Sequence, residues 1–442
     1  MKTPSIIQRS LATPKGRRLR RTINNIKITV LCGLMTILVL RGTIGAGQFG
    51  TPAQDFEEIR AHIRFATREY HAARVLSQIS EDDDSSWGNA EGAGEVRSDP
   101  EKPYSLGPKI SDWDSQREQW LSENARAGDS KSSGKPRMLL VTGSQPSSCE
   151  NPEGDHFLLK SIKNKLDYAR LHNIEIFYNM AHLDQEMAGF WAKLPLLRKL
   201  MLTNPEVEWI WWMDSDALFT DMSFEVPLEK YENFNLVMYG FDHKVYQQKL
   251  WTGLNTGSFF IRNCQWSMDL LDAWAPMGPK GVVRNKAGEL LSKSLTGRSN
   301  FEADDQSALV YLLITRREEW APKVLLENSY YLHGYWVDLV GKYEENMAKN
   351  HPGYGDDRWP FITHFVGCKP CLKNGGDYPV DTCFKQMDRA FTFADNQILD
   401  VLGFRHRKLG SPRVVRVRED TSHPLRLQGK SLDRLPVLEQ VI

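Results

Sequence analysis

The order of apolar runs in this 442-residue chain predicts an α/β fold with a parallel sheet covered by helices. Short strand-like runs at 138–144, 174–178 and 209–213 alternate with helical spacing at 155–172 and 184–202. Parallel neighbours need such crossover helices, and their strands end at one common edge of the sheet. Ligands of open α/β sheets bind outside this carboxyl edge. We therefore expect functional residues where the strands end.

The first strand closes with Gly143 and Ser144, and the second helix carries Lys193. The two residues after the strand are placed to meet a bound nucleotide, and the alternative is a simple tight turn. Lys193 is a second candidate for contact with the same ligand.

The apolar strand at 209–213 delivers Asp214, Ser215 and Asp216 at its end. Two carboxylates spaced i, i+2 after a buried strand suit a hard divalent ion such as Mn²⁺ or Mg²⁺. Because such an ion keeps positions open for phosphate oxygens, the pattern predicts a site for a sugar nucleotide. A pair of aspartates that only shapes a turn is the alternative.

Further strand-like and helical segments follow at 236–239, 253–261, 265–275, 304–313, 361–365 and 380–402. Asp304 and Asp305 open one of these helices, where capping and the helix dipole favour acidic residues. That explanation accounts for one carboxylate. Two of them before Gln306 also point to hydrogen bonds with sugar hydroxyls and to stabilisation of positive charge on a reacting sugar.

Two residues of the late segment could complete the site. His364 lies near the end of its strand and is suited to supply an imidazole ligand to the same ion, and a structural histidine is the alternative. Lys369, five residues later, could neutralise a leaving diphosphate, or it could simply be solvated.

Aromatic residues are the expected partners of apolar sugar faces. His333, Tyr335 and Trp336 are the candidates for binding such an acceptor, with core packing as the alternative for each.

The N-terminus predicts a membrane anchor. Residues 1–27 contain eight basic side chains and no acidic one, and an apolar run at 28–40 follows directly, inside the predicted anchor 28–46. Lys27 and Arg41 flank this short run and can snorkel, which gives a workable spanning length, and the basic side stays in the cytosol. A cleaved signal peptide is the alternative. A nucleic-acid-binding arm fits less well, since the charge stops where the apolar run begins.

Residues 47–104 are expected to form a stem. A helical stripe at 53–80 could seam two chains into a short coiled coil or lie on its own domain. The acidic, glycine-containing linker that follows is predicted to be disordered. The catalytic body, 105–442, would then lie in the lumen.

Five of the six cysteines follow the apolar segment, at positions 149, 264, 368, 371 and 383. In an oxidising lumen, a disulfide that uses two or more of Cys368, Cys371 and Cys383 is favoured over a zinc or redox site. Because five is an odd number, at least one thiol stays free, and the pairing cannot be read from spacing.

The chain resembles the plant xyloglucan 6-xylosyltransferases of glycosyltransferase family 34. The motifs that carry the resemblance are 213–217, 254–259, 274–279, 301–307 and 363–371, and it covers about residues 105–425 and the anchor's 39–45. Ala169 departs from the pattern where related sequences often have a cysteine, and 418–421 replaces a common glycosylation sequon. These departures concern a disulfide and a glycan, not the chemistry.

The resemblance implies a GT-A (Rossmann-like) fold, UDP-xylose as donor and a β-1,4-glucan as acceptor, with an α-1,6 linkage formed with retention. It further implies Mn²⁺ held by Asp214, Asp216 and His364, residence in the Golgi membrane, and possible homo- or hetero-oligomers with related transferases. Two rival functions remain. One is a galactomannan galactosyltransferase that uses UDP-galactose, and the other is a non-catalytic glucan-binding partner of an active transferase.

Overall fold

The computed structural model describes residues 104–124, 136–373 and 376–418. The predicted tail (1–27), anchor (28–46) and, up to residue 103, stem (47–104) lie outside these residues, so those predictions stay predictions. Within the described part of the chain, no helix is long and apolar enough to cross a membrane.

A six-stranded sheet in the order β2-β1-β3-β6-β5-β7 forms the centre of the body. Its strands are β1 (Met138–Gly143), β2 (Glu175–Asn179), β3 (Trp209–Met213), β5 (Leu236–Gly240), β6 (Leu254–Arg262) and β7 (Val324–Glu327). Strand β6 is antiparallel to β3 and β5, whereas the other pairs are parallel. The sheet is therefore mixed, and the prediction of a parallel sheet was wrong on this point. The chain turns back from β5 into β6 through a loop, and an antiparallel neighbour needs no crossover helix.

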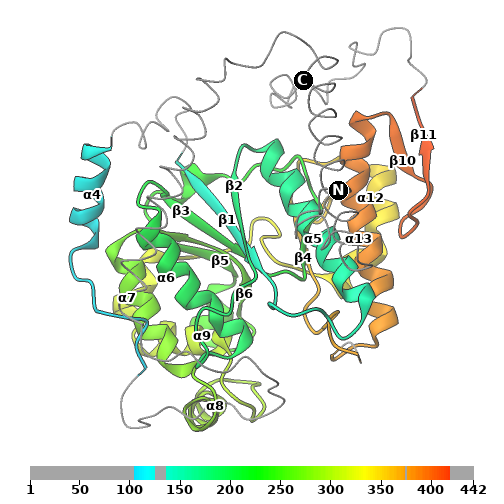
Figure 1. Ribbon diagram of the computed structural model, residues 1–442. Coiled ribbons are helices and arrows are strands. Elements are labelled where there is room, and N and C mark those ends of the chain that lie inside the picture. The colour runs from blue at the N-terminus through cyan, green and yellow to red at the C-terminus, as the bar shows by residue number, and fades with distance from the viewer. Residues whose placement is uncertain (1–103, 125–135, 374–375, 419–442) are drawn as a thin grey trace, which may run out of the picture. The chain divides into compact units, whose positions relative to one another are not determined.

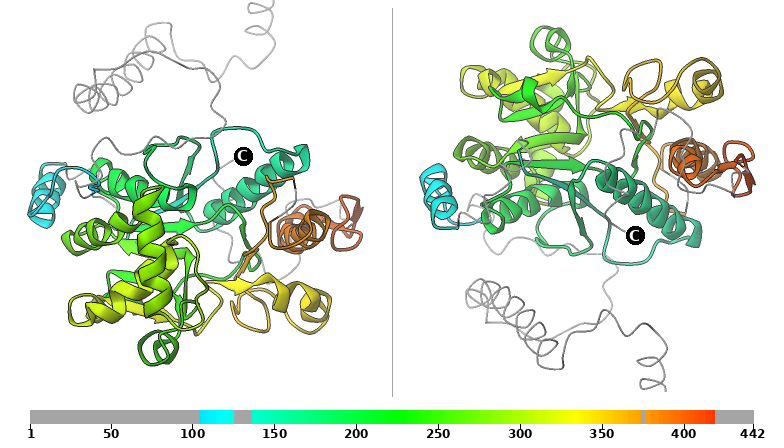
Figure 2. Two further views of the ribbon diagram at one scale, coloured as in Figure 1. Left: turned by 90° about the horizontal axis from the view of Figure 1, so that it is seen from below. Right: turned by 90° about the horizontal axis from the view of Figure 1, so that it is seen from above.

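Helices cover both faces of this sheet (Figure 1). They are α4 (Trp113–Glu123), α5 (Pro152–Leu171), α6 (Lys193–Thr203), α7 (Gln265–Trp274), α8 (Val282–Ser294), α9 (Asp305–Thr315), α10 (Arg317–Trp320), α11 (Trp336–Leu339), α12 (Tyr343–Lys349) and α13 (Val380–Val401). Both views of Figure 2 show α5 and α13 together on one side of the sheet and α6 with α7 on the other. This layering is the α/β architecture that the sequence predicts.

Strand β3 shows why its sequence is apolar throughout. Trp209 and Trp211 face the core beneath α5, while Ile210 and Trp212 face the core beneath α6, α7 and α9. Side chains of a strand alternate between faces, so a strand buried on both sides needs a continuous apolar run. The strand ends at Met213, and the two aspartates follow at the edge.

A second, three-stranded sheet lies beside the first, in the order β4-β9-β8. Its strands are β4 (Ala217–Phe219), β8 (Gly334–Tyr335) and β9 (Ile362–His364), and a separate hairpin joins β10 (Phe404–His406) to β11 (Val414–Arg416). The late strand was predicted, but its partners were not. The pairing of Ala217 with His364 matters most, because it brings the histidine to the end of β3.

Two helices begin three or more residues away from their predicted start. Helix α5 begins at Pro152, because Asn151 caps it by accepting a hydrogen bond from the Gly154 amide at 2.8 Å. The predicted helix at 184–202 begins only with the 3₁₀ turn η2 (Gly189–Ala192). The Asp184 carboxylate instead accepts hydrogen bonds from Tyr104 and from the backbone of Glu186.

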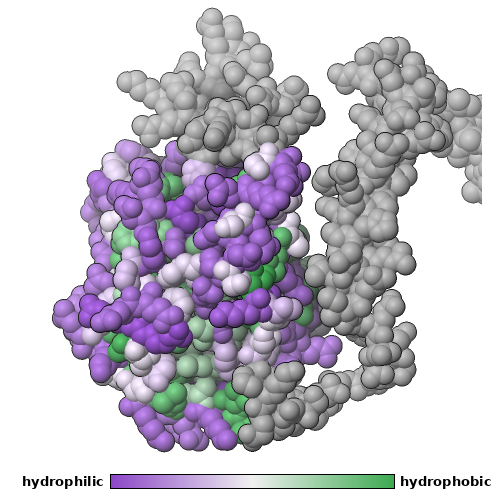
Figure 3. Space-filling view, turned by 90° about the vertical axis from the view of Figure 1, so that its left-hand side faces the viewer, coloured by the Kyte–Doolittle hydropathy of each residue, from purple (hydrophilic) through white to green (hydrophobic). Residues whose placement is uncertain are grey.

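The face shown in Figure 3 is mainly hydrophilic, with hydrophobic side chains in separate patches. Scattered apolar groups are normal on a soluble domain.

Candidate active site

The turn after β3 is held from the side of the main sheet. The amide of Asp214 donates to the carbonyl of Gly257 on β6 at 2.7 Å, and the Trp212 indole donates to the Asp214 carboxylate at 2.7 Å. The chain then returns as β4, and the amide of Phe365 donates to the carbonyl of Asp216 at 3.0 Å. The pairing of β4 with β9 therefore sets the position of His364 against this turn.

Asp214, Asp216 and His364 form a compact cluster. His364 Nε2 lies 3.2 Å from Asp216 Oδ1 and 3.8 Å from Asp214 Oδ2. One ligand atom from each residue falls within 4.8 Å of the others, and among the described residues this is the group of acidic, histidine or cysteine side chains that could hold a metal. Burial by itself would raise the pKa of Asp216, but His364 and Lys369 outweigh it and hold that pKa below its usual value.

This donor set fits the predicted ion. Two carboxylates and one imidazole are acceptable ligands for Mn²⁺. Gly257 has no side chain, and this leaves the space that the His364 ring occupies, because a Cβ on Gly257 would overlap that ring. His333 Nδ1 lies 2.9 Å from His364 Nδ1, so it can accept a hydrogen bond there. That bond would leave Nε2 of His364 free to bind a metal.

Helix α5 also holds the turn after β3, by side chains that donate to its backbone carbonyls. Ser161 Oγ donates to the carbonyl of Ser215 at 2.5 Å, and Lys165 Nζ donates to the carbonyl of Ala217 at 2.6 Å and to Ser161 at 2.7 Å. Lys165 is completely buried. Burial lowers the pKa of Lys165 to about 7, although the negative charges of Asp216 and Asp214 act to raise it. Lys165 was not among the site residues predicted from the sequence.

Lys193, predicted to contact the donor, is a buried link between two carboxylates. Its Nζ lies 2.6 Å from Asp305 Oδ2 and 4.0 Å from Asp214 Oδ1, and it donates to the carbonyl of Thr256 at 3.0 Å. Burial would lower the pKa of Lys193, but Asp305 and Asp214 raise it above its usual value. The lysine is therefore charged and joins α6 and α9 to the turn after β3.

The start of α9 separates the roles of its two aspartates. Asp304 caps the helix by accepting from the Ser307 amide at 2.7 Å, as in the capping alternative. Asp305 is buried and also accepts from Thr256 Oγ1 at 2.8 Å. Gln306 is anchored at 3.0 Å to the carbonyl of Trp251 and at 3.2 Å to Asn255. The structure thus brings Asp305 beside Lys193 and leaves Asp304 in the helix cap.

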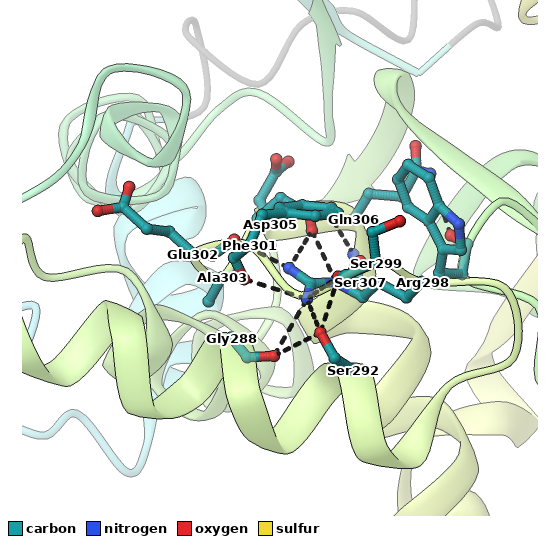
Figure 4. A network of polar contacts seen from close by, with 12 residues as sticks. Gly288, Ser292, Arg298, Ser299, Phe301, Glu302, Ala303, Asp305, Gln306 and Ser307 are labelled. Atoms are coloured by element: carbon teal, nitrogen blue, oxygen red, sulfur yellow. Dashed lines mark hydrogen bonds and ion pairs between the residues drawn. The ribbon is translucent and has the colours of Figure 1, made fainter.

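Arg298 is a second residue that sequence reasoning missed, and Figure 4 shows the loop wrapped around it. Its buried guanidinium donates to Asp304 at 3.0 Å and to Ser307 at 2.9 Å. It also donates to the backbone carbonyls of Gly288, Ser299, Phe301 and Glu302. A buried arginine with this many acceptors fixes the loop that leads into α9 and hence the direction of Asp305.

Gly143, Ser144 and Lys369 lie on the β1 side of the cluster. Gly143 packs so closely on the carbonyl of Asn179 that a Cβ would lie 2.5 Å from it, and Tyr178 donates to Ser144 Oγ at 2.9 Å. The exposed Lys369 lies in the loop after β9, close enough for its charge to act on Asp216.

Two disulfides tie down the loop that carries Lys369. Cys368 pairs with Cys383 of α13, which confirms the prediction for this cysteine group, and Cys371 pairs with Cys149 before α5. Among the described cysteines Cys264 is free, as expected from the odd count.

The three predicted acceptor residues occupy different surroundings. His333 lies against His364, as described above. Tyr335 is partly exposed and hydrogen-bonded to Tyr378, whereas Trp336 is buried, stacked on Phe365, and donates to the carbonyl of Val366 at 3.2 Å. Trp336 therefore has the core position that was the alternative for it.

The chain is a transferase enzyme, and its candidate site lies at the carboxyl edge of its sheet. The chain belongs to the galactosyl transferase GMA12/MNN10 family, glycosyltransferase family 34, whose sequence profile matches residues 134–375.

Two similar proteins are xyloglucan 6-xylosyltransferases 2 and 1 of Arabidopsis thaliana. Both are 57% identical to this chain, the first over 96% and the second over 95% of each sequence. A solved glycosyltransferase involved in the glycosylation of the major capsid of PBCV-1 is 15% identical, with a TM-score of 0.35 over 53% of this chain and 95% of that one.

Proposed function

We propose that this enzyme transfers xylose from UDP-xylose, with retention, to O6 of a glucose in a β-1,4-glucan, as a xyloglucan 6-xylosyltransferase. The observation that carries the proposal is the cluster of Asp214, Asp216 and His364 at the end of β3. Identity of 57% to two proteins of that name supports the choice of donor and acceptor.

In this proposal Asp214, Asp216 and His364 hold Mn²⁺. The bound ion would neutralise charge that develops on the diphosphate as the bond to xylose breaks. Lys369 adds a positive charge on the β1 side for the same purpose, and Gly143 and Ser144 lie where the nucleotide would meet the end of β1. The donor phosphates thus lie between the β1 edge and the metal ligands.

Asp305 is the residue that we assign to the sugar. Its carboxylate is bound to Lys193, which also approaches Asp214, and is held by Thr256, so it is oriented before substrate arrives. It would accept hydrogen bonds from xylose hydroxyls and stabilise positive charge at the anomeric carbon. Gln306, anchored to the backbone of Trp251, is placed to do the same from the next position.

We further propose a GT-A fold and a type II Golgi membrane protein with a lumenal body. The basic leader before the apolar segment supports the orientation. Protease treatment of sealed Golgi vesicles tests it: a C-terminal tag should survive and an N-terminal tag should be digested. The reverse pattern would contradict the proposal, and a surviving chain shortened by the leader and apolar segment would indicate a cleaved signal peptide. Self-association through 53–80 stays a prediction.

The function is tested with purified enzyme, cellohexaose, Mn²⁺ and either UDP-xylose or UDP-galactose. Transfer of xylose to O6, abolished by a chelator and restored by Mn²⁺, supports the proposal. Preferred transfer of galactose to a mannan would favour the galactosyltransferase alternative. Binding of cellohexaose without transfer from either donor would favour the non-catalytic partner.

A further inference from the structure

The residues assigned to the nucleotide, at the end of β1, lie on one side of the metal ligands. Gly143 and Ser144 end β1, and β1 and β3 are neighbours in the sheet. On the other side are β6, β5 and β7, and β5 ends at the same edge as β3 because both are antiparallel to β6. At the start of β6, Thr256 holds the Asp305 that we assign to xylose, whereas β5 and β7 carry no residue assigned to the donor.

A row of aromatic rings begins at the metal ligands and extends over this other side of the edge. His333 packs edge-on against His364 with ring centroids 5.0 Å apart, and the ring centroid of Tyr239, on β5, lies 5.6 Å from that of His333. The ring centroid of Tyr239 in turn lies 6.4 Å from that of Tyr331 and 5.5 Å from that of Phe241. The row comprises Tyr239, Phe241, Tyr331 and His333, and we call it the aromatic row.

The members of the aromatic row come from separate elements. Tyr239 and Phe241 stand at the end of β5, whereas Tyr331 and His333 precede β8. The pairing of β8 with β9 places Tyr335 opposite His364, which brings the segment before it to the site. All four residues are partly exposed, although the imidazole of His333 lies deepest. Core packing alone does not require four rings from two segments to remain at the surface beside a site.

The surroundings of the aromatic row suit a neutral, polar ligand with flat apolar faces. Tyr331 donates its hydroxyl to Asp357 at 2.5 Å, and Lys244 covers part of Phe241 with its ammonium 4.3 Å from the ring centre. A sugar chain presents C–H faces to rings and hydroxyls to such polar groups, and an extended chain can contact several rings at once.

We propose that the aromatic row is the platform for an extended β-glucan, and that it binds glucose units beyond the one that reacts. This inference rests on the proposed function, because it takes a glucan as the acceptor. Each ring adds contact with another unit of the chain. The aromatic row would therefore set the preference for long over short acceptors and would have little part in donor binding.

The test compares acceptor lengths in the full-length enzyme. Phe241→Ala removes one outer ring, and Tyr239→Leu removes the central ring but keeps an apolar side chain against the core. We expect either change to raise KM for cellohexaose about tenfold, a shift of the size that one lost ring contact produces. KM for cellotriose should rise less, and KM for UDP-xylose should stay within about twofold of the wild type.

Phe404→Ala is the matched control. Phe404 is also partly exposed and packs against a cation, Arg416, at 4.9 Å, but it lies in the hairpin of β10 and β11. The Phe404→Ala variant should show the same dependence of KM on acceptor length as the wild type. The same three variants are then compared by calorimetric titration with cellohexaose in the absence of donor.

The outcomes separate this inference from the proposed function. Suppose that the wild type transfers xylose. If KM for cellohexaose is then the same in the wild type and in both ring variants, the proposed role of the aromatic row is wrong. A wild type without transfer would count against the proposed function. In that case weaker calorimetric binding of cellohexaose by Phe241→Ala and Tyr239→Leu would still support the aromatic row, and unchanged binding would overturn it.

Discussion

The backbone of Gly257 lies directly against the ring of His364. A Cβ on Gly257 would overlap Cε1 and Nδ1 of that ring. The same glycine accepts the amide of Asp214 at 2.7 Å, so it joins the strand end to the histidine. A side chain at this position would force apart two of the three groups that we expect to bind the metal.

Gly257→Ala should therefore lower the affinity for Mn²⁺. We expect about a tenfold higher concentration of Mn²⁺ for half-maximal activity, the size of effect found when the support of a metal ligand is disturbed. Metal titrations of the purified variant measure this directly. Gly341→Ala is the control, because a Cβ on Gly341 meets no other atom within 4 Å.

An unchanged Mn²⁺ titration in Gly257→Ala would contradict the position of His364 over this glycine. A loss of maximal activity alone, at saturating Mn²⁺, would point instead to a displacement of Gln306, which is hydrogen-bonded to Asn255 beside this glycine.

Asp216→Ala should leave a folded enzyme with at least about 100-fold lower kcat/KM, because it removes a charged group that would hold the metal against the diphosphate. Circular dichroism checks the fold and UDP-xylose turnover gives the rate. Normal turnover with unchanged Mn²⁺ dependence would refute the site.

His364→Ala distinguishes a ligand from a structural histidine. We expect the rate and the Mn²⁺ affinity to fall together, since the imidazole would be lost from the metal while Asp214 and Asp216 stay. The measurement is activity against Mn²⁺ concentration, with thermal unfolding in parallel. If only the unfolding temperature falls, the histidine is structural.

Local patterns were enough to predict most elements. The apolar run 209–213 coincides with β3, and 265–275 differs from α7 by one residue at its end. Periodicity and burial along one segment carry this information. The direction of β6 and the pairing of β4 with β9 and β8 were not predicted, because strand pairing depends on contacts between segments far apart in the sequence.

The candidate site was predictable to the extent that its residues follow strands. Asp214, Asp216 and His364 meet as the family resemblance implied. Lys165 and Arg298 were not predicted. Charged residues in helices and loops are usually solvated, so each looks ordinary by itself. A signal existed for Lys165, which lies on the helical stripe of Phe157, Ser161 and Tyr168, but only the structure shows the carbonyl that it reaches.

The cysteines should show a simple labelling pattern. Without reduction, unfolded protein should be alkylated at Cys264 but not at the four cysteines of the two disulfides. In the folded enzyme Cys264 should react slowly, because burial raises the pKa of its thiol and little thiolate forms near neutral pH. Peptide mass spectrometry measures both, and labelling of Cys371 without reduction would contradict the pairing.

Lys165→Met should weaken Mn²⁺ binding by about tenfold. It removes the hydrogen-bond donor that holds the carbonyl of Ala217, and with it a contact that positions the turn carrying the metal ligands. Lys163→Met is the matched control on the same helix. Lys163 is 47% exposed and pairs with Asp167 and Asp395, so its loss should change stability only slightly. Equal Mn²⁺ titrations for both variants would show that Lys165 does not position the turn.

The same lysine predicts a dependence of stability on pH in metal-free protein. Burial, opposed by Asp216 and Asp214, lowers the pKa of Lys165 in the folded protein to about 7, against 10.5 for an ordinary lysine. Between these two values the unfolded chain binds more protons at Lys165 than the folded one, so the free energy of unfolding rises with pH. Urea unfolding of the wild type and Lys165→Met across this range isolates the effect of one residue. The wild type should gain stability relative to the variant as the pH rises from 7 to 10.5, and a constant difference would mean that the lysine keeps an ordinary pKa inside the protein.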